Sequence, residues 1–88
     1  MPITGELDLH TFRPQDLGDL MPDYIEACRA KGIYKLRIIH GKGIGNLRRS
    51  VGAILARHPS VLSFTQASEQ FGGWGATIVE LRRDQRDR

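Results

Sequence analysis

The feature that most constrains the fold of this chain is a glycine-rich turn that separates an apolar segment from an amphipathic one. Glycine occupies positions 41, 43 and 45, directly after an apolar run that ends in His40. The missing Cβ atoms allow the backbone of such a turn to take positive φ angles and to approach a ligand closely. Apolar residues then recur at helical spacing from Leu47, so a helix should begin behind the turn. Its N-terminal amides and the positive end of its dipole would point back at the turn, which favours an anion there, a phosphate above all.

Basic side chains accompany this turn. A lysine within a glycine-rich turn, Lys42, is predicted to contact phosphate. Arg48 and Arg49 stand near the positive end of the helix dipole, an unfavourable place for a cation, which either a bound phosphate or a solvated helix face would explain. The glycines of the turn do not have the spacing of a P-loop. No glycine stands at the third position that a dinucleotide-binding fingerprint requires. The predicted phosphate-binding residues are Gly41, Lys42, Gly43, Gly45, Arg48 and Arg49.

The whole chain alternates between strand and helix patterns. Short stretches of alternating polarity are typical of strands, and apolar residues spaced by three or four are typical of helices. The strand before the glycine turn carries large aliphatic residues on both faces, which predicts a central position in a sheet. Strands are expected over residues 6–10, 33–39, 61–67 and 74–81, and helices over residues 13–31 and 47–58.

The order β-α-β-α-β-β predicts an α/β fold in two layers. Each β-α-β step should be a right-handed crossover between parallel strands, and the last two strands should pair antiparallel. Two helices can cover only one face of a four-stranded mixed sheet, so we expect a two-layer sandwich. The carboxyl ends of the first two strands would then lie at one edge, where open α/β sheets usually bind ligands. His10 and the glycine turn should meet there.

Three polar side chains at these strand ends are the candidate catalytic residues. Asp8 and His10 share a strand face, as a general acid/base and its orienting carboxylate would, because histidine titrates near neutral pH. The other interpretation is a structural pair at the end of a strand. His40 is predicted to be a second proton carrier or a phosphate contact, although a histidine that closes a buried strand is as often structural. Asp8, His10, His40 and His58 show no zinc spacing, so no metal site and no cofactor are expected.

Composition limits the class of protein. The chain has 88 residues, which suits one small domain over residues 1–88, with a core at about 7–81 and a frayed tail at 82–88. The formal net charge of +3 permits a nucleic acid partner without demanding one. The single cysteine, Cys28, cannot form an internal disulfide. With no signal peptide pattern and no membrane-length apolar run, we expect a cytoplasmic protein that does not contact membranes. A monomer is the default expectation.

Three ordered blocks resemble the Smr (small MutS-related) domain family. They are Leu-Asp-Leu-His at residues 7–10, His-Gly-Lys-Gly-x-Gly-x-Leu-Arg at 40–48, and Gly-Gly-x-Gly-Ala-Thr-x-Val-x-Leu at 72–81. The resemblance covers nearly the whole chain. It implies a β-α-β-α-β-β fold like the C-terminal domain of bacterial translation initiation factor three, which agrees with the order above. The family includes enzymes that nick or cleave nucleic acids, and members linked to recombination control, messenger RNA decay and stalled ribosomes.

The resemblance also assigns roles by position. The Asp-x-His motif of the family falls on Asp8 and His10, and its glycine loop on residues 41–45. The family usually has glycine where this chain has Thr11, and threonine or serine where it has Ile44. The hydroxyl absent at Ile44 would have been a phosphate donor, which weakens the prediction of cleavage more than that of binding.

Two classes of function follow, with a weaker third. The leading hypothesis is a nucleic-acid-binding Smr domain with endonuclease activity, metal-independent or metal-assisted, on RNA rather than DNA. The alternative is a non-catalytic module that binds DNA, structured RNA or the ribosome. The third is a protein-interaction domain without affinity for nucleic acid.

Overall fold

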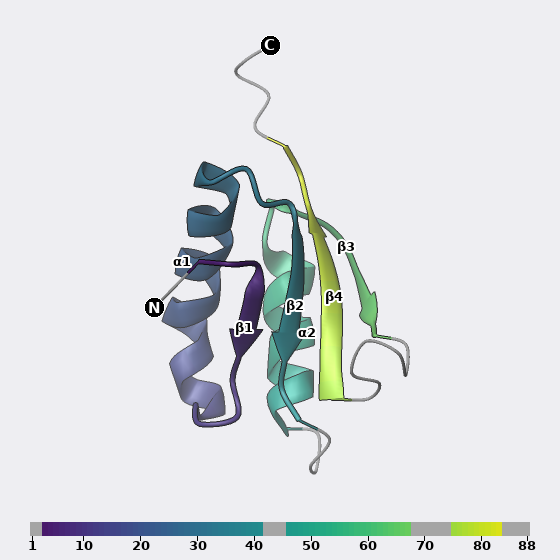
Figure 1. Ribbon diagram of the computed structural model, residues 1–88. Coiled ribbons are helices and arrows are strands. Elements are labelled where there is room, and N and C mark those ends of the chain that lie inside the picture. The colour runs from purple at the N-terminus through teal and green to yellow at the C-terminus, as the bar shows by residue number, and fades with distance from the viewer. Residues whose placement is uncertain (1–2, 42–45, 68–74, 84–88) are drawn as a thin grey trace.

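The computed structural model describes residues 3–41, 46–67 and 75–83, and it has the predicted order of strands and helices (Figure 1). The predicted Lys42, Gly43 and Gly45 lie outside the described residues. The strands are β1 (Glu6–Asp8), β2 (Lys35–Ile39), β3 (Val61–Gln66) and β4 (Ala76–Leu81). The helices are η1 (Pro14–Asp16), a short 3-10 turn, then α1 (Leu17–Ala30) and α2 (Asn46–Arg57).

The four strands form one mixed sheet in the order β1-β2-β4-β3. β1 and β2 are parallel, with Asp8 level with Ile39, and β4 is antiparallel to both of its neighbours. The predicted central position of β2 and the antiparallel pairing of the last two strands are therefore confirmed. β2 and β3 run in the same direction, as predicted for a β-α-β step, but β4 lies between them.

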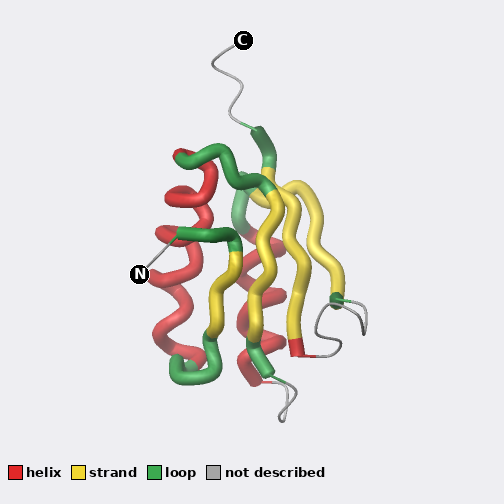
Figure 2. The backbone as a smooth tube through the Cα atoms, in the orientation of Figure 1, coloured by secondary structure: helices red, strands yellow, loops and turns green. Residues whose placement is uncertain are grey.

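Both helices lie on one side of the sheet, which confirms the two-layer sandwich (Figure 2). The core lies between the layers. It is built from alternate strand residues and from one stripe of each helix, since side chains on a strand point to opposite faces in turn. Among the described residues, the largest fully buried side chains are Leu9, Leu17, Met21, Ile25, Cys28, Leu36, Ile38, Val51, Leu55 and Val79.

No helix of the described residues covers the other face of the sheet. On β2, Lys35, Arg37 and Ile39 alternate with the buried residues and remain at least partly exposed. Arg37 forms an ion pair across the strands with Glu6 of β1. Because Asp8 is level with Ile39, it lies on this same open face.

A buried tyrosine of helix α1 is hydrogen-bonded to the backbone at the start of β1. The hydroxyl of Tyr24 accepts a hydrogen bond from the amide of Gly5 at 3.1 Å and donates one to the carbonyl of Glu6 at 3.1 Å. Gly5 has a φ of +93°, a backbone conformation that favours glycine. The short strand that carries Asp8 is thereby tied to the helix layer at its start.

Element boundaries differ from the predictions by a few residues. The segment that Pro14 opens is a 3-10 turn, and the α-helix itself begins at Leu17. It ends as predicted, with Gly32 at a φ of +78° and its amide donating to the carbonyl of Arg29. Neither helix of the described chain is long and apolar enough to cross a membrane.

Candidate functional site

The candidate site lies at one edge of the sheet, which we call the loop edge. The carboxyl ends of β1 and β2, the N-terminus of α2 and the start of β4 all face this edge (Figure 1). The register continues past the strands, since the amide of Leu9 donates to the carbonyl of Ile39 at 2.7 Å. His10, one residue further on, is therefore brought to the same edge as His40 and Gly41. The structure thus places Asp8 and His10 at the same edge of the sheet as the start of the glycine turn.

Asp8 and His10 form a direct pair at this edge. Asp8 Oδ1 lies 2.7 Å from His10 Nδ1, and it also accepts a hydrogen bond from the backbone amide of His10 at 3.0 Å. These two hydrogen bonds from His10 lower the pKa of the Asp8 carboxyl below its ordinary value. An ionised carboxylate can only accept, so Nδ1 carries the proton and Nε2 of the neutral ring keeps its lone pair. The side chain of His10 is 69% exposed, which leaves the pair open to a ligand.

The segment after His10 folds into a fixed turn. The amide of Phe12 donates to the carbonyl of Leu9 at 2.8 Å, and the amide of Arg13 donates to Asp16 Oδ2 at 3.1 Å. Phe12 packs against the core. His10 therefore projects from a backbone that is held on both sides, by the sheet and by this turn.

His40 has a different environment. The residue is 4% exposed, and both of its ring nitrogens have partners. Nδ1 lies 3.0 Å from the carbonyl of Gly41, which can only accept, so this nitrogen carries the proton. Nε2 lies 2.9 Å from Thr77 Oγ1, whose hydroxyl donates to it when the ring is neutral. This geometry fits a positioning role for His40, and the sequence-based role of a second proton carrier or a phosphate contact stays a prediction.

Backbone contacts fix the first residue of the glycine turn to the start of β4. The carbonyl of Gly75 accepts hydrogen bonds from the amides of His40 at 2.9 Å and Gly41 at 3.0 Å. Gly41 has a φ of +83°, so the turn begins with the positive backbone angle that glycine favours. Gly75 and Thr77 thus support the loop edge. The sequence analysis did not identify either as a site residue, although both stand in the third of the recognised motif blocks.

The basic residues after the turn lie on the surface. Arg48 and Arg49 are exposed in the first turn of α2. The N-terminus of that helix faces the loop edge, so its dipole contributes positive potential there. In the described ranges, no three side chains of histidine, cysteine, aspartate or glutamate gather as metal ligands would.

Comparison with known proteins identifies relatives over most of the chain. Residues 7–82 match the family described as Smr domain. The chain is 42% identical over 77 residues to the endonuclease MutS2 of a Geobacillus species, covering 88% of this chain and 10% of that protein. It is 38% identical over 80 residues to the endonuclease MutS2 of Shouchella clausii, covering 91% of this chain and 10% of that protein. The chain therefore spans about a tenth of the length of these curated relatives.

Solved structures agree in fold. The Smr domain of Thermus thermophilus MutS2 superposes with a TM-score of 0.84 at 37% identity, covering 90% of this chain and 99% of that one. YdaL, a stand-alone small MutS-related protein from Escherichia coli, also gives a TM-score of 0.84, at 27% identity, covering 93% of this chain and 67% of that one.

Proposed function

Because this chain belongs to the Smr domain family, we propose that it binds nucleic acid at the loop edge and cleaves its phosphodiester backbone there. The observation that carries the proposal is the Asp8–His10 pair, a carboxylate and an exposed imidazole 2.7 Å apart. Its relatives named endonuclease MutS2 support an endonuclease rather than another hydrolase.

His10 acts as the general base in this proposal. Cleavage requires that a proton leave the attacking oxygen while the phosphate accepts that oxygen. Asp8 holds Nδ1 in its protonated form, so Nε2 is the nitrogen that takes the proton. The imidazolium that forms is then stabilised by the same carboxylate, as in a catalytic triad. Solvent at this exposed edge returns a proton to the leaving oxygen.

The glycine turn and α2 hold the phosphate in this proposal. Lys42, the amides of the turn, Arg48 and Arg49 supply positive charge and N–H donors. His40 sets the start of the turn, because its ring donates to the carbonyl of Gly41 while Thr77 fixes the other side of the ring. A shift of that ring would move the phosphate site relative to His10.

RNA is the proposed substrate. A base on the protein can activate the 2′-hydroxyl of RNA, which lies next to the scissile phosphate. Attack by that oxygen forms a cyclic phosphate and releases the 5′-oxygen, and the proton taken from the hydroxyl goes to Nε2. DNA lacks this internal nucleophile, so its cleavage would need an activated water instead.

A second candidate function is a non-catalytic module that binds RNA, the ribosome or DNA. The observation that favours it is Ile44, where the family resemblance leads us to expect a hydroxyl. Without that donor, the turn has one fewer group to stabilise charge on the phosphate, which cleavage needs more than binding does.

The experiment compares wild type with His10→Ala and Arg49→Gln on labelled single-stranded RNA, duplex RNA and duplex DNA. We expect His10→Ala to abolish cleavage while it leaves affinity nearly unchanged. Arg49→Gln should weaken binding to all sequences and lower the salt dependence by about one phosphate contact. Cleavage at equal rates by wild type and His10→Ala would overturn the catalytic assignment, and affinity without turnover would favour the binding module.

A further inference from the structure

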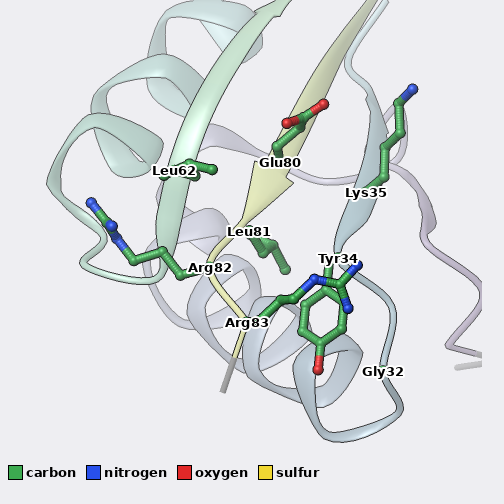
Figure 3. A pocket seen from close by; sticks show the side chains of 8 residues that line it. All are labelled: Gly32, Tyr34, Lys35, Leu62, Glu80, Leu81, Arg82 and Arg83. Atoms are coloured by element: carbon green, nitrogen blue, oxygen red, sulfur yellow. The ribbon is translucent and has the colours of Figure 1, made fainter. Parts of the chain in front are cut away.

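A charged cavity lies at the end of the sheet opposite the loop edge, where β2 begins and β4 ends. We call it the far pocket. Its volume is about 610 Å³, and Figure 3 shows the side chains that line it. The lining residues are Gly32, Tyr34, Lys35, Leu62, Glu80, Leu81, Arg82 and Arg83. Three of them are cationic and one is anionic, in a chain whose formal net charge is only +3.

Arg82 is held firmly at this pocket. Its amide donates to the carbonyl of Ser60 at 2.8 Å, and its carbonyl accepts from Arg29 Nε at 3.0 Å. Its own Nε donates to the carbonyl of Pro59 at 3.1 Å. The two terminal nitrogens of the guanidinium carry further donors, and within the described part of the chain no carboxylate pairs with them. A guanidinium fixed in this way is preorganised to bind a phosphate or a carboxylate.

Arg83 stacks on an aromatic ring beside it. Its guanidinium carbon lies 4.6 Å from the centre of the Tyr34 ring, and Figure 3 shows the two planes together. Arg83 as a whole residue is exposed. Nucleic acid bases stack on guanidinium planes and on aromatic rings. Leu62, which is 55% exposed, adds an apolar wall.

We propose that the far pocket binds a nucleotide of the same nucleic acid strand that occupies the loop edge. Its base stacks on Arg83 over Tyr34, and Arg82 and Lys35, which extend to opposite sides of the pocket (Figure 3), contact different phosphates of the strand. This inference rests on the proposed function, because it assigns a second contact to the same ligand. The combination of a flat stacking surface with fixed guanidinium donors fits a nucleotide better than an acidic peptide, which has carboxylates and no bases.

The open face of the sheet connects the two contacts. Lys35 lies at the far pocket and Ile39 at the loop edge, with Arg37 between them on the same face. The five residues of β2 span about 16 Å at the usual rise of a strand. A strand of about 16 nucleotides therefore reaches both contacts easily.

The test measures affinity for single-stranded RNA of about 16 nucleotides, the long RNA, with wild type, Arg83→Gln and Arg49→Gln. Arg57→Gln is the matched control, because it removes the same charge from an exposed position in the last turn of α2. We expect Arg83→Gln, which removes the guanidinium on which the base stacks, to weaken binding of the long RNA about fivefold. Arg57→Gln should not change the affinity by that amount.

A second oligonucleotide isolates the stacking step. A 16-nucleotide strand of abasic residues keeps the phosphates and lacks the bases, so wild type should bind it less tightly than RNA by about fivefold or more. Tyr34→Leu should reduce that preference, while Tyr34→Phe, which keeps the ring, should preserve it.

The binding measurements distinguish failure of the far-pocket proposal from failure of the proposed function. If wild type binds the long RNA, Arg49→Gln weakens that binding, and Arg83→Gln behaves like Arg57→Gln, the far pocket is not a nucleic acid contact. Arg83-dependent binding of oligoglutamate with unchanged binding of RNA would likewise overturn the inference in favour of an acidic peptide. Wild type that binds no nucleic acid at all would overturn both proposals.

Discussion

Tyr24→Phe removes one oxygen atom from the core. The resulting loss in the free energy of unfolding follows from the two hydrogen bonds that this oxygen makes. The hydroxyl accepts from the amide of Gly5 and donates to the carbonyl of Glu6, each at 3.1 Å, and Tyr24 is 2% exposed. Phenylalanine keeps the ring in place, so the packing is preserved while the buried amide loses its partner. An unsatisfied buried group costs about 1–3 kcal/mol, and we expect a loss of about 2 kcal/mol in the free energy of unfolding.

That loss is readily measured. At about 4–8 °C per kcal/mol for a domain of this size, the midpoint of thermal unfolding should fall by about 8–16 °C. Urea unfolding followed by circular dichroism gives the free energy directly. Tyr34→Phe is the matched control, because Tyr34 is partly exposed and its hydroxyl has no hydrogen bond among the described contacts. A loss for Tyr24→Phe no larger than for that control would refute the claim that this hydroxyl fastens β1 to α1.

Three further predictions concern stability and the loop edge. Gly5→Ala should lower the free energy of unfolding by about 1–2 kcal/mol, measured by urea titration, because a Cβ at a φ of +93° is strained and would lie 3.1 Å from a neighbouring side chain. The pKa of Glu26 is lowered below its ordinary value, chiefly by the hydrogen bond from Ser60. Its stabilising contribution is present above about pH 4.5 and is lost as the pH falls through the lowered folded pKa, so the stability difference between wild type and Glu26→Gln should shrink as the pH falls below about 4.5. Thr77→Val should weaken RNA affinity with little change in fold by circular dichroism, since it frees the His40 ring that sets the start of the turn; unchanged affinity would contradict that role.

The fold was predictable because each element has a clear local pattern. Alternating polarity marks the strands, and large aliphatic residues on both faces correctly predict the central position of β2. The position of β4 between β2 and β3 was not predicted, because a local pattern does not record which strands pair. The residues at which helices and strands begin and end were also predicted less accurately than their order. Proline at position 14 favours a first helical turn of either kind, and here that turn is 3-10.

The candidate site was predictable in part. Parallel pairing of β1 and β2 brings His10 to the start of the glycine turn, as expected from the positions of the motifs. The environment of His40 was not predictable, because its partner Thr77 lies 37 residues away in the chain and on a different strand. The roles of Lys42, Gly43 and Gly45 stay predictions from the sequence, since these residues lie outside the described ranges.

The most direct test of the account is single-turnover cleavage of labelled RNA by wild type and His10→Ala, with binding measured on the same samples. Wild type is expected to cleave the RNA, and His10→Ala is expected to bind it with similar affinity without cleaving it. Equal cleavage by both proteins would contradict the assignment of His10 as the general base.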